Sequence, residues 1–212
     1  MYGTRVMGNI EIPSSHFRPI KHTRSNPNEM DIHFKQHRDI LKQRLHLLGL
    51  EEIQINADGN CFFTALSDAL RRKYRFEIKP SEIRSLCVKE WLQNKETYAV
   101  FSNGLFEEKN ILKFKNDGHY DCELGDLLPL TAANTLGIRI TVISSIEKYS
   151  DNIEFIPASP KQIDKNKPEV SDVHVYLAFT QYRKGHYNST QAIGQNSTNS
   201  TLDLETKSMN IR

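Results

Sequence analysis

Cys61 follows a turn sequence and immediately precedes an apolar segment. Residues 58–63 read Asp-Gly-Asn-Cys-Phe-Phe, and Asp-Gly-Asn is typical of tight turns. A thiol between a turn and a helix faces unpaired backbone N–H groups, which stabilise a thiolate. The same N–H groups can stabilise an oxyanion in acyl transfer. The stretch therefore predicts a nucleophilic Cys61, with Asp58, Gly59 and Asn60 in the loop that precedes it.

A nucleophilic cysteine needs a base, because only about 3% of an unperturbed thiol is ionised at pH 7. Of the eight histidines, His186 is the candidate, since it follows a predicted strand and a glycine turn. Asn188 lies two residues later, and residues two apart on an extended segment share a face. Asn188 could then accept the ring N–H of His186 and fix its tautomer. Asn188 also begins a glycosylation sequence, but without a secretory signal we favour the orienting role.

Other readings of the cysteines and histidines remain open at this point. Cys61 on its own could be a small buried residue, the usual fate of a free cysteine. His119 and Cys122 form a rival catalytic pair or half of a metal site, but no second half is recognisable. We therefore predict no metal. Cys87 shares a helical face with Ile83 and Trp91, which predicts a core position.

Composition limits the class of protein. The chain has 212 residues, 38% of them apolar, and a net charge of +2, which fits one domain with tails and argues against a nucleic-acid binder. Three cysteines do not suggest a disulfide framework, so we expect a reducing compartment, the cytoplasm, with the nucleus as an alternative. We find no membrane-spanning apolar run and no apolar core of a signal peptide.

The ends of the chain lack the periodicity of folded elements. The first 50 residues hold eight Lys or Arg against four Asp or Glu, and we read residues 1–30 as a flexible basic arm. Residues 191–212 read as a disordered polar tail. The folded domain is expected between them, over residues 31–190.

Periodicity predicts helices first and strands afterwards. The expected helices cover residues 34–50, 61–72, a segment opening at Pro80, and the second part of 124–137; the expected extended segments are 51–55, 138–144, 152–156 and 173–181. We place Phe62, Ala65, Leu66, Ala69 and Leu70 on the inward face of the helix at 61–72, with Asp58 or Asn60 as its cap. This order indicates an α+β fold with helices packed around a small central sheet.

The two motifs together resemble those of the ovarian-tumour (OTU) family of cysteine deubiquitinases. The resemblance rests on Asp-Gly-Asn-Cys-Phe-Phe at 58–63 and on Gly-His-Tyr-Asn at 185–188, and it covers about residues 31–190. It implies a papain-like cysteine protease fold. Between the motifs, only the general layout of helices followed by strands matches.

The resemblance also implies roles. Cys61 would be the nucleophile, His186 the base, and Asn188 its orienter. Asp58 would hold the cysteine loop, and backbone N–H groups near Asp58, Gly59, Asn60 and Cys61 would bind the oxyanion. The reaction would be hydrolysis of the isopeptide bond at the C-terminal glycine of ubiquitin through a Cys61 thioester, without cofactor or metal.

The implied partner is ubiquitin or polyubiquitin chains, bound by a monomer that uses neither nucleic acid nor membrane. Two alternatives stay open. One is a catalytically silent ubiquitin-binding module, which the intact set of proposed catalytic residues disfavours. The other is a protease that acts on a ubiquitin-like modifier or a polyprotein.

Overall fold

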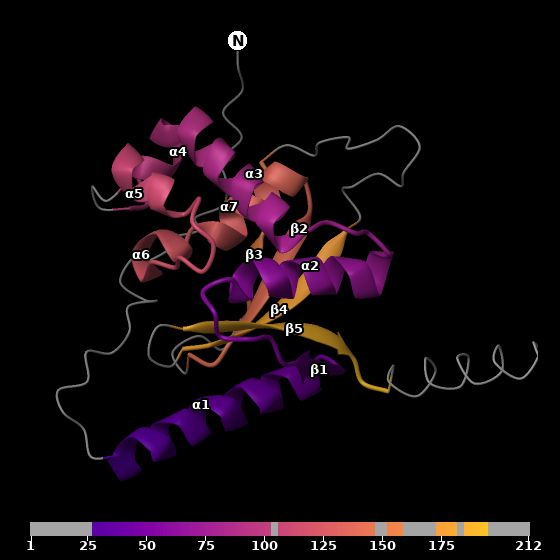
Figure 1. The fold of residues 1–212 in the computed structure, drawn as a ribbon. Helices are drawn as coiled ribbons and strands as arrows, with labels where there is room; N and C mark the ends of the chain where they lie inside the picture. Colours follow the sequence, from indigo (N-terminus) through magenta and orange to yellow (C-terminus); the bar gives the residue numbers. More distant parts are fainter. Residues whose placement is uncertain (1–26, 103–105, 147–151, 159–172, 182–184, 195–212) are drawn as a thin grey trace, which may run out of the picture.

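A mixed sheet forms the centre of the molecule (Figure 1). The computed structural model describes residues 27–102, 106–146, 152–158, 173–181 and 185–194. Within them, five strands form one sheet in the order β1-β5-β4-β2-β3. The strands are β1 (Leu50–Ile53), β2 (Arg139–Ser144), β3 (Ile153–Phe155), β4 (His174–Thr180) and β5 (His186–Ala192). β2 and β4 run parallel, and the other neighbouring strands pair antiparallel.

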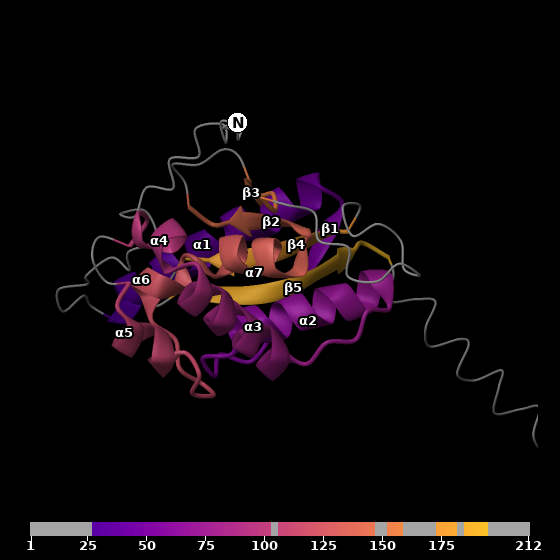
Figure 2. The same ribbon diagram turned by 90° about the horizontal axis from the view of Figure 1, so that it is seen from above.

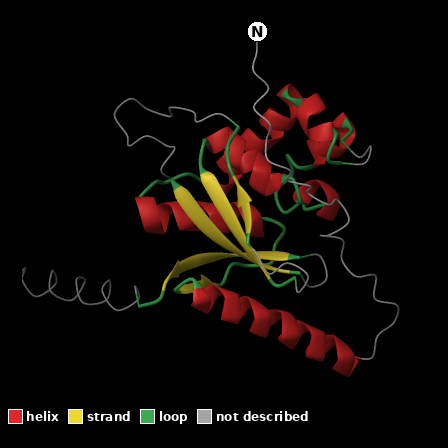
Figure 3. Cartoon of the chain, turned by 180° about the vertical axis from the view of Figure 1, so that it is seen from behind, coloured by secondary structure: helices red, strands yellow, loops and turns green. Residues whose placement is uncertain are grey.

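Helices cover both faces of this sheet (Figures 2 and 3). They are α1 (Pro27–Leu47), α2 (Cys61–Tyr74), α3 (Pro80–Gln93), α4 (Lys95–Ala99), α5 (Glu108–Lys113), α6 (Cys122–Gly125) and α7 (Leu128–Leu136). α1 packs Leu41 and Leu45 against Ile143 and Ala178 on one face. The main core, with α2, α3 and α7, lies on the other. The predicted α+β class, with helices around a small central sheet, is confirmed.

α2 is the helix that carries Cys61, and its apolar face follows the predicted spacing. The five side chains predicted to point inward are all buried, at 4% exposure or less: Phe62, Ala65, Leu66, Ala69 and Leu70. This face packs onto β5, where the Phe62 ring meets the Tyr187 ring edge-on at 5.1 Å. The first turn of α2 is therefore anchored to the strand that carries His186 and Asn188.

α1 differs at both ends from the helix expected over residues 34–50. α1 begins at Pro27 and ends at Leu47, so the helix starts inside the predicted arm. Phe34 and Leu48 are 44% and 45% exposed, because the α1 side chains that pack on the sheet, Leu41 and Leu45, lie in the C-terminal half of the helix and Leu48 follows its end. Gly49 adopts a φ of +68°, as expected for the glycine that turns the chain out of the helix.

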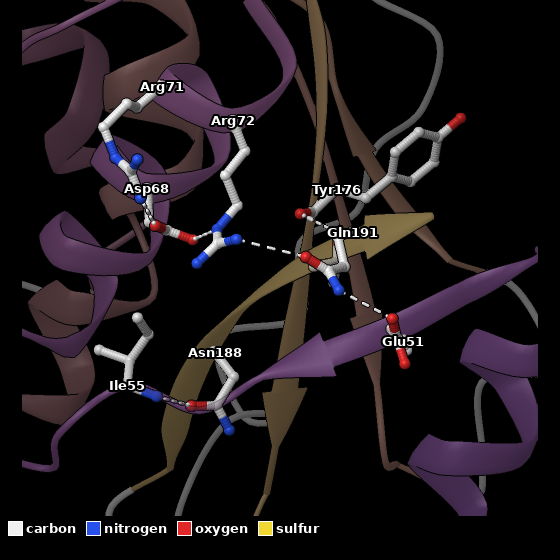
Figure 4. Close-up of polar contacts among 9 residues, drawn as sticks. Glu51, Ile55, Asp68, Arg71, Arg72, Tyr176, Asn188 and Gln191 are labelled. Carbon is white, nitrogen blue, oxygen red and sulfur yellow. Dashed lines mark hydrogen bonds and ion pairs between the residues drawn. The ribbon is translucent and has the colours of Figure 1, made fainter. Parts of the chain in front are cut away.

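β5 was not predicted as a full strand, although β2, β3 and β4 match the expected segments. Its sequence, His-Tyr-Asn-Ser-Thr-Gln-Ala, is mostly polar, yet five of its seven residues are buried. Asn188, Thr190 and Gln191 hydrogen-bond to neighbouring groups instead of facing solvent. Arg72 of α2 donates to Gln191, which in turn donates to Glu51 of β1 (Figure 4). Residues 159–172, between β3 and β4, lie outside the described residues.

β5 also extends the folded part beyond residue 190. Ala192 pairs with Leu50, Gln191 pairs with Glu51, and the N–H of Ile193 donates to the Gly49 carbonyl. We expect a chain ending at Gly194 to unfold at the temperature of the full chain. A chain ending at Thr190 should unfold about 5 °C lower or more, because it loses these bonds. Thermal unfolding followed by circular dichroism measures both melting temperatures. Equal values for the two shortened chains would contradict a folded domain that extends beyond residue 190.

Candidate active site

The loop before Cys61 is held by the Asp58 side chain. Asp58 Oδ1 accepts the backbone N–H of Asn60 at 2.8 Å, which is the geometry of an Asx turn. Gly59 adopts a φ of +79°, and a Cβ there would lie 1.9 Å from the Gly118 carbonyl oxygen. The loop therefore needs glycine at this position both for its backbone conformation and for its contact with residue 118.

Cys61 is the first residue of α2, and the residue is 6% exposed. Burial raises the pKa of the Cys61 thiol above its ordinary value; hydrogen bonds from the backbone of Tyr187 and Phe62 lower the pKa, but do not overcome burial. The sequence predicted that the helix start would favour the thiolate, and the Phe62 contribution has that sign. The net direction is nevertheless upward, so this thiol depends on a nearby base to ionise.

The backbone contact of Cys61 is with Tyr187, the residue that follows His186 at the start of β5. His186 Nε2 lies 3.0 Å from Asn188 Oδ1 and 3.0 Å from the Ile55 carbonyl oxygen. Both partners only accept hydrogen bonds, so Nε2 must carry the proton. Nδ1 then keeps its lone pair and can accept a proton. The bond between His186 and Asn188 is the one that their two-residue spacing predicted.

Asn188 is 1% exposed, and the protein occupies both ends of its amide. Oδ1 also accepts the Ile55 backbone N–H at 2.7 Å (Figure 4), and Nδ2 donates to Glu52 Oε1 at 2.6 Å. A glycan on Nδ2 would require this buried group to leave the sheet. The geometry therefore agrees with the orienting role.

Comparison with known proteins supplies the family. The chain is 33% identical over 156 residues to the ovarian tumor domain-containing deubiquitinating enzyme 9 of Arabidopsis thaliana, covering 73% of this chain and 39% of that protein. It is 31% identical over 183 residues to enzyme 11 of the same series and organism, covering 85% of this chain and 66% of that protein. The chain belongs to the OTU domain family.

A solved structure agrees on the fold of this OTU domain. The OTU domain of OTUD1 superposes with a TM-score of 0.50 at 17% identity, covering 76% of this chain and 97% of that chain. No protein-family model matches the sequence. The chain spans 39% and 66% of the two Arabidopsis proteins, so their lengths include regions without a counterpart here.

Asn60 has a different role in this OTU domain from the one the sequence predicted. It occupies the N-cap position of α2, but its side chain makes no cap hydrogen bond. Instead, Asn60 Oδ1 accepts from Arg84 Nη2 at 2.7 Å and from the Gly118 N–H at 3.1 Å. The prediction of a side-chain cap at Asn60 is therefore wrong. The Asn60 N–H is also bonded to Asp58, which makes it a poor candidate for binding an oxyanion.

Arg84 of α3 is a site residue that the sequence reading missed. Its guanidinium donates to the carbonyl oxygens of Gly59, Phe114 and His119 at 2.9 to 3.1 Å and lies 4.2 Å from the centre of the Phe63 ring. The residue is 3% exposed, and burial lowers the pKa of Arg84. Arg84 therefore ties the cysteine loop to the loop after α5. An arginine on the apolar stripe of α3 was the available signal.

Replacing Arg84 by methionine should destabilise the OTU domain by about 2–4 kcal/mol, because buried carbonyl oxygens lose their donors. Arg84→Lys should recover only part of this loss, since one ammonium cannot reach both loops. Chemical denaturation measures the change. Arg71→Met is the matched control, because Arg71 is 51% exposed and pairs only with Asp68 among the ion pairs of the described residues. Equal losses of unfolding free energy for Arg84→Met and Arg71→Met would contradict the role of Arg84 in tying the two loops together.

The remaining candidates lie elsewhere. Cys87 is 1% exposed, and burial raises the pKa of its thiol far above the ordinary value, so its predicted core position is confirmed. His119 packs edge-on against the Phe114 ring at 5.2 Å, and the Cys122 side chain lies outside the described set. Among the described side chains, no group of three or more His, Cys, Asp or Glu could hold a metal ion.

None of the described helices has the length and apolar character needed to cross a membrane.

Proposed function

We propose that this chain is a deubiquitinase that hydrolyses isopeptide bonds at the C-terminal glycine of ubiquitin. The observation that carries the proposal is the pair of hydrogen-bond acceptors at Nε2 of His186. Two acceptors hold the proton on Nε2, so Nδ1 is ready to accept the Cys61 proton. The Arabidopsis relatives, both named deubiquitinating enzymes, supply the substrate class.

The reaction has two acyl-transfer steps. In the first, His186 Nδ1 takes the Cys61 proton while Sγ attacks the glycine carbonyl carbon. The C–N bond breaks, the lysine amine leaves with the proton from His186, and ubiquitin remains as a thioester on Cys61. In the second, His186 accepts a proton from water, whose oxygen attacks the thioester, and the proton then returns to Sγ.

The other loop residues support these steps. Asn188 orients His186, and Asp58 holds the loop through the Asn60 N–H. Since that N–H is occupied, we assign oxyanion binding to the backbone N–H groups of Asp58, Gly59 and Cys61. One such donor contributes about 2.7–4 kcal/mol to transition-state stabilisation. The chain's own residues supply every proton transfer.

The catalytic unit in this proposal spans residues 27–194, with tails on either side. This range replaces 31–190 because α1 begins at Pro27 and the turn after β5 reaches Gly194. Within the proposal the domain acts as a monomer in the cytoplasm and engages ubiquitin or polyubiquitin chains. The sparse, odd number of cysteines supports the reducing compartment.

Intact-mass spectrometry after incubation with ubiquitin that carries a C-terminal thiol-reactive warhead tests the proposal. One ubiquitin adduct per chain is expected, followed by cleavage of polyubiquitin in a gel assay. No adduct on a folded protein that still binds ubiquitin would indicate a silent ubiquitin-binding module. An adduct only with a probe of a ubiquitin-like modifier would identify that modifier as the substrate and refute the ubiquitin assignment.

A further inference from the structure

The orientation of the Asn188 amide influences which ring nitrogen of His186 carries the proton, and therefore how well the ring works as a base. With Oδ1 toward His186, the ring donates from Nε2 and Nδ1 stays unprotonated. If the amide were rotated by half a turn, its NH2 group would face both His186 Nε2 and the Ile55 N–H. Nε2 would then lie between a donor, the Asn188 amide, and an acceptor, the Ile55 carbonyl oxygen. The tautomer with the proton on Nδ1, which leaves Cys61 without a proton acceptor, would therefore gain population.

Two groups fix this orientation from opposite sides. The Ile55 backbone N–H can only donate, and it donates to Oδ1 at 2.7 Å. The Glu52 carboxylate can only accept, and it accepts from Nδ2 at 2.6 Å. In Figure 4 the amide oxygen of Asn188 faces Ile55 while its nitrogen points away from Ile55. Because Asn188 is 1% exposed, water is poorly placed to substitute for the carboxylate.

Glu52 is itself held in place between β1, α1 and β5. Its backbone lies opposite Thr190 in the sheet. Glu52 Oε2 accepts from Gln54 Nε2 at 2.9 Å and pairs with Arg38 of α1 at 3.2 Å. The Glu52 side chain is 13% exposed against 38% for Arg38. The carboxylate is therefore directed at Asn188 from a shielded position, and one cation, Arg38 of α1, pairs with it.

We propose that Glu52 is a positioning residue that fixes the Asn188 amide and, through it, the tautomer of His186, with Arg38 holding Glu52. This inference rests on the proposed function, because it names what makes His186 competent as the base. It adds to the motif a residue whose sequence position, six residues before Asp58, gave no sign of a role.

Exchanging the donor and the acceptor tests the contact. Asn188→Asp alone places two carboxylates face to face and should slow adduct formation by about tenfold or more. The double variant Glu52→Gln with Asn188→Asp lets the new amide donate to the new carboxylate, while Oδ1 still accepts from His186 and Ile55. It should recover most of the lost rate. No recovery in the double variant would overturn the proposal.

Removing the carboxylate tests the same point from the other side. Glu52→Ala should lower the rate by about tenfold or more, whereas Glu52→Gln, which keeps an acceptor oxygen, should lose less. Glu51→Gln is the matched control, since Glu51 bonds Gln191 and not Asn188, and its rate should stay near that of the wild type. Equal rates for Glu52→Ala and the wild type would overturn the proposal.

The ring nitrogen shifts of His186, measured by ¹⁵N nuclear magnetic resonance, separate this inference from the proposed function. Wild type should show Nε2 protonated, and Glu52→Ala should show a growing share of the Nδ1–H tautomer. This readout needs no ubiquitin, so a wild type without adduct would refute the function and leave the inference to be decided by the spectra. An unchanged tautomer in a folded Glu52→Ala protein would overturn it.

Discussion

Replacing Cys61 by alanine is expected to abolish the covalent ubiquitin adduct and polyubiquitin cleavage while leaving the fold intact. The rate should fall by about four orders of magnitude or more, because the covalent step has no other nucleophile. The side chain is buried, at 6% exposure, and losing one sulfur atom there should cost about 1 kcal/mol or less. Intact mass and thermal unfolding, measured on the same sample, check both parts.

Two further variants serve as controls for this result. Cys122→Ala and His119→Ala remove the rival pair and should leave adduct formation near the wild-type rate. Cys87 should stay unmodified in every sample, because burial keeps its thiol protonated. An adduct on Cys61→Ala that disappears in Cys122→Ala would transfer the nucleophile to residue 122 and refute the assignment of Cys61.

The fold was predictable wherever a pattern extends over several turns or alternates cleanly. α2 and α3 begin at the predicted residues, Cys61 and Pro80, because turn chemistry and helical periodicity agree there. The short helices α4, α5 and α6 have five, six and four residues, too few for a period to emerge. β5 was not predicted as a full strand because most of its buried side chains are polar. Polar side chains are buried only when neighbouring elements supply hydrogen-bond partners, and the sequence does not show those partners.

Part of the candidate site could be predicted from the sequence, and part could not. Asp58 through Cys61 and His186 with Asn188 are contacts between sequence neighbours, so their spacing alone predicts them. Arg84 and Glu52 act on these residues from other elements, and no spacing rule connects them to the motifs. The direction in which the Cys61 pKa shifts could not be predicted from the sequence either. Burial is the largest cause of the shift, and burial depends on the packing of α2 against β5.

Replacing His186 by alanine should have the second large effect, and its size should depend on pH. Burial raises the pKa of the Cys61 thiol, so without a base little thiolate is present near neutral pH. The adduct rate of His186→Ala should therefore be lower by several orders of magnitude near pH 7. It should then rise about tenfold per pH unit as hydroxide deprotonates the thiol, up to the raised pKa.

The measurement is the second-order rate of adduct formation with the ubiquitin warhead between about pH 6 and pH 10 for both proteins. Wild type should react well at neutral pH, so the two curves should approach one another only at the alkaline end. His46→Ala is the matched control, because His46 is exposed in the last turn of α1 and its loss should leave the curve unchanged. If His186→Ala keeps the neutral-pH rate while His119→Ala loses it, the base is His119. A parallel, pH-independent drop in His186→Ala would instead mean that His186 contributes through structure, since removing a base must leave the thiol dependent on hydroxide.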